Sequence, residues 1–532
     1  MTARTGAGAL EAPARPPTAH GPALGASPRG AVARRLSDSL SARGLLVGSV
    51  FVLLAWVVIR PVQDPDYWWH VTAGHWILQH RALPGHDLFT YTAAAHPWVD
   101  HEYLSEIALH LLQQSLGVAG VSVLFGAISL AGIWLIDRRS QLEPQPYVIR
   151  ALLLGLAGVA GSPFWGPRPQ MLTFFFVCLE LYWLERFLLR GDRQIYWFPL
   201  LMVLWANLHG GFLIGFLFLC IALVARLAEA VARRQRRPAV EALRIGLVGL
   251  ASVAGALLTP YTYRLFSYAA EPQASPLQQS LILEWLSPDF HALAFKPFEA
   301  MVLALVAGMA FSRPRLYEVL LALATLTLAL QSVRHVPIFL AACTPILIRL
   351  YGDAWRRLAR ERGWRLPRSQ ASPALAAVTA SVLLALAVFI GIAAERRLAA
   401  QEALTRTTYP VAASDWLAAH PGVGTRMFNS YGWGGYLVYR FYPTPQRRVF
   451  VFGEATLMGD EQLQSYADIA GIRADWQTRL RSAGVDYVVF NRNAPLSNAL
   501  AVDPHWRLAY EDRVAVVYVR VPEGPTAAPD PR

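Results

Sequence analysis

Two aspartates near the start of the chain are the first residues that could do chemistry. The segment "DPDYWWH", residues 64–70, places Asp64 and Asp66 beside two tryptophans and His70. A carboxylate within reach of a hydroxyl can take its proton while the oxygen attacks an electrophile, so either aspartate is a candidate catalytic base. His70 is a candidate for substrate contact. Capping of the following helix explains Asp66 equally well, whereas Asp64 then has no evident structural task.

A second acidic segment, "PWVDHEYLSE", contains Asp100, His101 and Glu102. Asp100 also precedes an expected helix and could cap it. If both ends of this loop converge, all three residues become candidates for substrate binding. Two carboxylates can also hold a divalent cation, so Asp66 and Glu102 are candidate metal ligands, although their spacing matches no fixed ligand pattern. The sequence indicates no other cofactor.

Arginines outside the basic clusters form a third group. Arg168 and Gln170 lie in "GPRPQ", and Arg334 with His335 ends a long apolar segment. A guanidinium at the membrane surface matches the phosphate of a lipid headgroup or of a lipid-linked substrate, so we expect these residues to contact substrate. Snorkelling of either arginine to ordinary phospholipid is equally compatible with the sequence.

Three further groups have both a structural and a functional explanation. Asn207 and His209 in "WANLHGG" are costly against lipid, so we expect them to face the protein interior. Hydrogen bonding between helices is favoured over substrate contact for both. Trp68 and Trp69 are typical of a membrane interface, although a sugar ring would use the same faces. Glu454 follows the segment "RRVFVFG", where an ordinary loop acid is favoured over a substrate contact.

The composition is that of a polytopic membrane protein. Of 532 residues, 55% are hydrophobic and only 16% are charged. The net charge of +12 comes from arginine clusters between apolar segments, which is typical of cytoplasmic loops and not of a nucleic-acid-binding surface. The three cysteines each lie in an apolar segment, so we expect neither a disulfide nor a zinc site.

The expected fold class is an α-helical polytopic membrane protein with about 11 transmembrane helices, surface helices in the first outer loop and a small C-terminal α/β domain. The arginine-rich loops fall on every second connection. Placing them in the cytoplasm puts the N-terminus inside, and loop 60–117 and the chain after about residue 398 outside. The predicted spans are 44–59, 118–136, 148–164, 171–188, 196–208, 211–226, 245–260, 297–311, 316–331, 336–350 and 374–394.

Four parts follow from these patterns. They are a disordered cytoplasmic tail at 1–42, a transmembrane domain at 43–398, an extracytoplasmic α/β domain at 399–523 and a disordered tail at 524–532. In the outer loop, helical spacing predicts two helices lying flat on the membrane, the second ending at Gly117. In the α/β domain, "RRVFVFG", "VDYVVFN" and "VAVVYVR" predict buried strands, and "YADIAGIRADWQTRLRSAG" predicts a helix.

The motifs "DPDYWWHVTAGHWI", "HPWVDHEYLSE", "RPQMLTFFF", "WANLHGG" and "SVRHVPIF" resemble a bacterial branch of the glycosyltransferase C superfamily of integral membrane enzymes. The resemblance covers roughly residues 44–520. It implies a catalytic aspartate in the first outer loop, at Asp64 or Asp66, and a polyprenyl-phosphate sugar as donor. It also implies a multi-pass protein of the bacterial inner membrane. No "WWDYG"-like string is present, which disfavours transfer of a glycan to asparagine.

The function expected on this basis is inverting transfer of a sugar to the hydroxyl of a glycan, lipid or protein acceptor outside the cytoplasm. Asp64 or Asp66 would act as base, and Arg168 and Arg334, with His335 or a metal ion, would stabilise the departing lipid phosphate. The alternatives are a transporter or flippase of a lipid-linked or anionic solute, and a non-catalytic scaffold of the cell envelope. A transporter would normally carry ionisable residues near the midplane, where only Glu180 clearly lies within a span.

Overall fold

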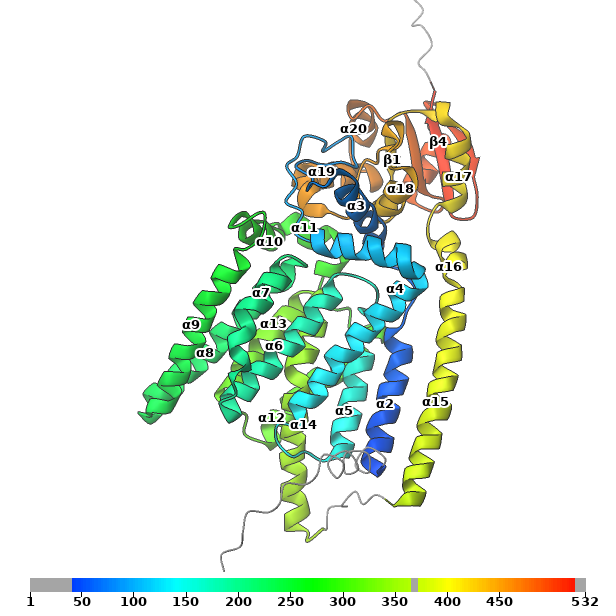
Figure 1. Cartoon of the computed structure of the whole chain (residues 1–532). Helices are drawn as coiled ribbons and strands as arrows, with labels where there is room; N and C mark the ends of the chain where they lie inside the picture. The colour runs from blue at the N-terminus through cyan, green and yellow to red at the C-terminus, as the bar shows by residue number, and fades with distance from the viewer. Residues whose placement is uncertain (1–40, 365–371, 522–532) are drawn as a thin grey trace, which may run out of the picture.

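The computed structural model describes residues 41–364 and 372–521. The two tails predicted to be disordered therefore lie almost wholly outside the described residues. Figure 1 shows two parts, a bundle of helices and a smaller α/β domain that covers one end of the bundle. We call that end of the bundle the domain end.

The polytopic helical fold is confirmed. Every predicted span coincides with a bundle helix, and within the described residues six helices are long and apolar enough to cross a membrane, with three shorter apolar helices beside them. The count of eleven crossings stays a prediction. The bundle helices are α2 (Ala42–Val58), α4 (Tyr103–Ser140), α5 (Tyr147–Ala160), α6 (Gln170–Arg190), α7 (Phe198–Ala206), α8 (Leu213–Arg233), α9 (Arg236–Ala256), α12 (Lys296–Phe311), α13 (Leu316–Gln331), α14 (Val336–Glu361) and α15 (Pro373–Ala399).

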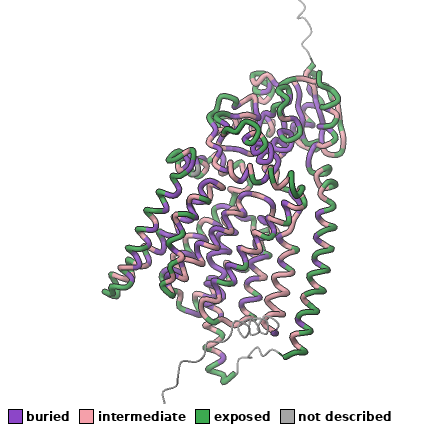
Figure 2. Tube along the Cα trace, viewed as in Figure 1, coloured by how far each residue is buried: buried purple, intermediate pink, exposed green. Residues whose placement is uncertain are grey.

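Burial differs strongly among these helices. α14 is largely buried and contacts α4, α5, α6, α12 and α13, so it forms the centre of the bundle. α15 packs mainly against α2, and most of its residues are exposed, as Figure 2 shows. Many of these exposed residues are apolar, such as Leu384 and Phe389. Exposed apolar surface of this kind is expected where lipid, rather than protein, covers a helix.

A break in α4 creates the surface helix expected in the first loop. Gly117 has φ +67°, a left-handed conformation that glycine adopts without steric cost, and it separates a segment before it from the membrane-spanning segment after it. In Figure 1 the first segment runs across the domain end of the bundle. The predicted boundary at Gly117 is therefore confirmed.

The other helix of this loop, α3 (Asp66–His80), lies between the first segment of α4 and the α/β domain. Trp68 and Trp69 are only 5% and 3% exposed. The Trp68 ring contacts Tyr409 and Tyr436, and the Trp69 ring contacts Phe452, all from the α/β domain. The expectation that these tryptophans lie at a membrane interface is wrong, because the C-terminal part of the chain folds back over α3 and buries them.

The α/β domain contains one four-stranded sheet with the strand order β1-β2-β4-β3. β1 pairs parallel to β2, with Met427 opposite Tyr487, and the other two pairings are antiparallel. The segments "VDYVVFN" and "VAVVYVR" form β2 and β4, as predicted. The strands are β1 (Met427–Asn429), β2 (Tyr487–Asn491), β3 (Trp506–Glu511) and β4 (Ala515–Arg520), and the helices are α16 (Gln401–Thr408), α17 (Val411–Ala419), α18 (Gly434–Phe441), α19 (Ala455–Ala470), α20 (Trp476–Ser482) and α21 (Pro495–Val502).

The predicted strand at "RRVFVFG" is wrong. Its backbone is buried but bonds outside the sheet: the N–H of Val449 donates to the carbonyl of Phe89, and the N–H of Phe450 donates to the side chain of Asn429. The single predicted helix over 466–484 is also wrong, because it is interrupted between α19 and α20. The segment 447–453 therefore ties the α/β domain to the first loop, and this connection positions the site.

Candidate active site

A polar cavity of about 390 Å³ lies at the domain end, between the bundle, α3 and the α/β domain. Nine of the twelve residues predicted to act as the base or to bind substrate line this cavity. Asp64, Asp100 and Asn207 are the three that do not line it. The predicted residues in its wall are Asp66, His70, His101, Glu102, Arg168, Gln170, His209, Arg334 and His335.

Asp64 is held by Arg168 and has a structural task after all. The Nε of Arg168 lies 2.6 Å from Oδ2 of Asp64, and the same guanidinium pairs with Glu284. The other oxygen of Asp64 accepts the backbone N–H of Asp66 at 2.9 Å. From the sequence, Asp64 has no evident structural task and Asp66 is a candidate cap of the helix. In the structure it is Asp64 that binds the first residue of α3. Arg168 is correspondingly committed to two carboxylates.

Asp66 faces the cavity. Its Oδ1 accepts a hydrogen bond from Nε1 of Trp69 at 3.0 Å, and its carboxylate lies against the backbone of Gly453. A Cβ at position 453 would overlap with the Asp66 carboxylate, so only glycine permits this approach. Burial and the nearby charge of Asp64 raise the pKa of Asp66 well above its ordinary value, while the Trp69 hydrogen bond opposes the shift. A carboxylate with a raised pKa is a better proton acceptor than a solvated one.

Glu102 is surrounded by three histidines. Its oxygens lie 3.5 Å from Nε2 of His70, 3.3 Å from Nε2 of His101 and 3.3 Å from Nε2 of His209. Burial disfavours ionisation of Glu102, but these imidazoles bring its pKa well below the ordinary value. Burial also lowers the pKa of His101, yet the hydrogen bond and charge of Glu102 outweigh it and raise that pKa to about 9. Glu102 and His101 are therefore an ion pair at neutral pH.

His209 is neutral, and its protonation can be assigned. Burial lowers its pKa to about 4 against the opposing charge of Glu102. Its Nδ1 accepts the backbone N–H of Gly211 at 2.9 Å, so the ring proton is on Nε2, which faces Glu102. The sequence favours hydrogen bonding between helices as the role of His209. His209 contacts Thr173 of α6 in this way, and it also lines the cavity.

Asp100 does not cap α4, because Glu102 occupies the position before the helix and no side chain caps it. The Asp100 carboxyl instead forms a hydrogen bond with the side chain of Glu106. Burial raises the pKa of Asp100 to about 7, although this hydrogen bond and the charge of His101 oppose the shift. One oxygen of each carboxyl group has no donor within the described residues. A single proton shared between the two carboxyl groups would satisfy both oxygens. Neither group lines the cavity, so both lie behind its wall.

Arg334 has a different environment from Arg168. Its guanidinium stacks over the ring of Trp285, with 4.4 Å from Cζ to the ring centre, and forms no ion pair or hydrogen bond with the described part of the chain. Nδ1 of His335 and Oε1 of Gln170, both buried in the same cavity wall, also have no hydrogen-bond partner among residues 41–364 and 372–521. Unpaired buried polar atoms around a cavity are the features expected of a site that binds a polar ligand.

The α/β domain contributes a residue that the sequence analysis judged to be an ordinary loop acid. Glu454 is 8% exposed, lines the cavity and accepts a hydrogen bond from the hydroxyl of Tyr268 at 2.7 Å. Tyr268 belongs to α10 (Arg264–Ala274), a helix at the domain end that the sequence analysis did not predict. Only the position of Glu454 after a buried segment pointed to it, because 186 residues separate these two partners along the chain.

The residues present do not fit a metal ion held by Asp66 and Glu102. Within 41–364 and 372–521, no three His, Cys, Asp or Glu side chains are arranged to hold one. Both oxygens of Glu102 face imidazole nitrogens, and Asp66 accepts from Trp69. We therefore derive no step through a metal ion.

Fold and site together define a polytopic helical membrane protein with an acidic cavity between its bundle and a small α/β domain. No family model and no curated protein matches the sequence. The archaeal oligosaccharyltransferase AglB from Archaeoglobus fulgidus, solved with an inhibitory peptide and a dolichol-phosphate, is similar at a TM-score of 0.50 and 13% identity, over 90% of this chain and 75% of its own. This likeness shows a shared fold.

Two further solved structures are similar at lower scores. ArnT from Cupriavidus metallidurans, bound to undecaprenyl phosphate, has a TM-score of 0.46 and 15% identity over 91% of this chain and 100% of its own. The arabinofuranosyltransferase AftD from Mycobacteria has a TM-score of 0.46 and 16% identity over 91% of this chain and 40% of its own.

Proposed function

We propose that this chain is a membrane glycosyltransferase that transfers a sugar from a polyprenyl-phosphate donor to a hydroxyl group of a glycan, lipid or protein acceptor. One observation carries the proposal: a single cavity contains an aspartate suited to accept a proton and an arginine that forms no ion pair within the described residues. These are the two charges that such a transfer needs, a base for the acceptor and a cation for the leaving phosphate.

Arg334 is the residue that binds the donor phosphate. Arg168 already neutralises Asp64 and Glu284, whereas the guanidinium of Arg334 is free to form charge-assisted hydrogen bonds. The cavity wall also contains apolar side chains of the bundle helices, Leu217 of α8, Leu328 of α13 and Ile338 of α14. An apolar wall of this kind suits an isoprenoid chain. A dolichol-phosphate bound to AglB, which shares the fold, supports a donor of this class.

The transfer proceeds by direct displacement with inversion. The acceptor oxygen forms a bond to the anomeric carbon while Asp66 takes the hydroxyl proton. The bond between the anomeric carbon and the phosphate oxygen breaks, its electron pair stays on the phosphate, and Arg334 stabilises that charge. Asp64 and Arg168 act through Asp66, because they fix the start of α3 and set the charge beside it.

The site faces the outside of the cell in this proposal. The arginine clusters at the ends of α4, α6, α8 and α14 lie at the end of the bundle remote from the α/β domain. The positive-inside rule places that end in the cytoplasm, and with it the N-terminus. The cavity and the α/β domain are then extracytoplasmic, on the bacterial inner membrane, where a lipid-linked sugar is available and a nucleotide sugar is not.

The test uses the purified chain in lipid nanodiscs with a panel of radiolabelled polyprenyl-phosphate sugars, and it measures release of the free lipid phosphate. Asp66→Asn should reduce release by roughly 100-fold or more, the usual contribution of a catalytic base. The matched control is Glu402→Gln, an exposed carboxylate paired with Arg406 on α16. Release with none of the donors, or equal release by the Asp66→Asn variant, would contradict the proposal.

A transporter is the second candidate, and Glu180 is the observation in its favour. Glu180 is fully buried in α6, and neither of its oxygens has a partner within the described residues. Glu180→Gln keeps the shape and removes the titratable carboxyl group, so a transferase should retain its rate and stability in this variant. A transporter that couples to protons through Glu180 would lose uptake of solute into proteoliposomes, with Asp66→Asn as the converse control.

A further inference from the structure

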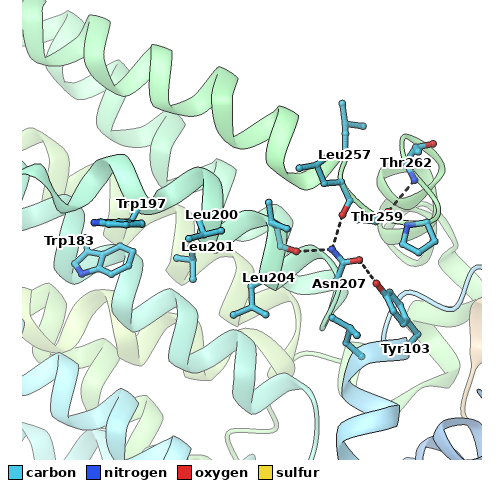
Figure 3. A pocket seen from close by; sticks show the side chains of 14 residues that line it. Tyr103, Trp183, Trp197, Leu200, Leu201, Leu204, Asn207, Leu257, Thr259 and Thr262 are labelled. Atoms are coloured by element: carbon cyan, nitrogen blue, oxygen red, sulfur yellow. Dashed lines mark hydrogen bonds between the residues drawn. The ribbon is translucent and has the colours of Figure 1, made fainter. Parts of the chain in front are cut away.

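A second cavity lies behind one wall of the polar cavity. It has a volume of about 1140 Å³ and is lined mainly by apolar side chains, mostly from α7 and from the segment 257–262 that follows α9. Figure 3 shows Trp183 and Trp197 at one end of it and Asn207 with Tyr103 at the other. α7 is only nine residues long, about 13.5 Å at 1.5 Å per residue, so it leaves an apolar space that a full-length span would fill. Lining side chains such as Leu200 and Leu258 are more than half exposed, so this space opens on the outer face of the bundle.

Two short segments that contact each other contribute residues to both cavities and separate them. Three contacts join residues 102–105 of the first loop to residues 207–209 after α7. Tyr103 donates to Asn207 at 2.6 Å, Ser105 donates to the carbonyl of Leu208 at 2.5 Å, and Glu102 faces His209 at 3.3 Å. Glu102 and His209 line the polar cavity, whereas Tyr103 and Asn207 line the apolar one.

The chemistry of the second cavity excludes the donor phosphate. Among the described residues, no charged side chain lines it. Its polar side chains at the domain end are Tyr103, Asn207, Thr259 and Thr262, and the indole groups of Trp183 and Trp197 lie at the other end. Asn207 is satisfied by three hydrogen bonds, to Tyr103 and to the carbonyls of Val203 and Leu258, so it closes this end and does not bind a charge. Hydroxyl groups at the end of an apolar cavity suit a neutral headgroup that carries hydroxyls.

We propose that this cavity holds the hydrocarbon chain of the acceptor, and that the acceptor is a neutral lipid with a hydroxyl-bearing headgroup. This inference rests on the proposed function. The donor's chain lies below Arg334, and the acceptor's chain lies on the other side of the Glu102–His209 wall. The acceptor headgroup passes over the Tyr103–Asn207 pair into the polar cavity, where its hydroxyl oxygen reaches Asp66.

The test is photocrosslinking of the full chain in phosphatidylcholine nanodiscs. One probe is a diacylglycerol with a diazirine in an acyl chain, and the other is a phosphatidylcholine with the same labelled chain. We expect the diacylglycerol probe to label residues 198–208 and 257–262 more strongly than the phosphatidylcholine probe does. Unlabelled diacylglycerol should compete for this labelling, and unlabelled phosphatidylcholine should not.

Two substitutions connect the labelling to the cavity. Leu204→Trp and Leu258→Trp fill it with a ring at positions that are 47% and 67% exposed, so the fold should tolerate both. Each should reduce the labelling roughly tenfold, because the ring excludes the chain. Leu384→Trp on α15 is the matched control, since Leu384 is also 67% exposed but lies outside the cavity. The control should leave the labelling unchanged.

Equal labelling by both probes on α7 and α15 would overturn the proposal, because it would mean that ordinary bilayer lipid fills the cavity. Competition by undecaprenyl phosphate would also overturn it, in favour of the donor's chain. The binding test does not depend on transfer, so Asp66→Asn should keep the labelling. Where a donor supports transfer, Leu258→Trp should raise the KM for diacylglycerol roughly tenfold and leave release of lipid phosphate to water unchanged. Failure of the proposed function and failure of this inference are therefore separate outcomes.

Discussion

Arg168 binds the carboxylate of Asp64 and not that of Asp66, with 2.6 Å from Nε to Oδ2. Because Asp64 also accepts the backbone N–H of Asp66, the pair fixes the start of α3 from one side. The carboxylate of Asp66 is left to face the cavity. Two aspartates that the sequence could not rank thus differ in environment, and this difference is the reason for proposing Asp66 as the base.

Arg168→Gln should shift the pH dependence of transfer. The positive charge of Arg168 lowers the pKa of Asp66, while the charge of Asp64 raises it. Removal of the guanidinium leaves Asp64 uncompensated, so the pKa of Asp66 should rise and the acid limb of the kcat/KM profile should move to higher pH. The variant should also lose about 3 kcal/mol of stability, since two partly buried carboxylates lose their partner. An unchanged acid limb would remove Asp66 from the role of base.

Arg334→Gln should raise the KM for the donor roughly 10- to 100-fold, which corresponds to the loss of charge-assisted hydrogen bonds to phosphate. Since Arg334 forms no ion pair within the described residues, thermal stability should change little. Arg334→Lys keeps the charge and should recover part of the affinity. Arg397→Gln is the control, because Arg397 also stacks on a tryptophan, Trp56, but lies away from the cavity. Equal effects of Arg334→Gln and Arg397→Gln on KM would contradict donor binding.

Gly453→Ala should lower kcat without unfolding the protein. The added Cβ would overlap with the Asp66 carboxylate, which is the flexible end of a side chain and can rotate away at small cost. The rate should fall because the base leaves its position, while the α/β domain keeps its sheet. Gly432→Ala is a matched control in the same domain, since a Cβ there meets no atom within 4 Å. The measurement is the transfer rate beside a thermal unfolding curve for both variants.

The bundle could be predicted from the sequence because the bilayer imposes length and polarity on each span. The apolar length of α2, α5 and α13 is sufficient to locate them in the sequence. The positions of the arginines predict the direction in which each helix crosses the membrane. The acidic segments were located as well, since carboxylates at the end of a span have few structural explanations. Arg168 and Arg334 stood out because arginine is scarce beside the apolar segments at the domain end and clusters at the opposite end of the bundle.

The contacts between distant segments could not be predicted. Trp68 and Trp69 have the sequence pattern of an interface, and their burial depends on Tyr409, Tyr436 and Phe452, which lie more than 300 residues later. The segment 447–453 has the composition of a strand, but the side chain of Asn429 and the backbone of Phe89 take the hydrogen bonds that a ladder would use. Composition reports burial, and it does not report the partner.

The ion pair of His101 and Glu102 should make the stability fall as the pH rises. The pKa of His101 is about 9 in the folded protein and 6.5 in its ordinary state, so the folded protein binds more protons between these values. The stabilisation is complete below pH 6.5 and is lost as the pH rises through 9, with a size on the order of 3 kcal/mol. Asp100, whose pKa is raised to about 7, acts in the same direction but is fully ionised before the upper part of this window.

Glu102→Gln removes the hydrogen bond and the charge that raise the pKa of His101, so the stability of this variant should depend little on pH between 7.5 and 9.5. Thermal unfolding in nanodiscs across that window measures the difference. An equally steep slope in Glu102→Gln would contradict the ion pair, because it would mean that Glu102 does not hold His101 as a cation.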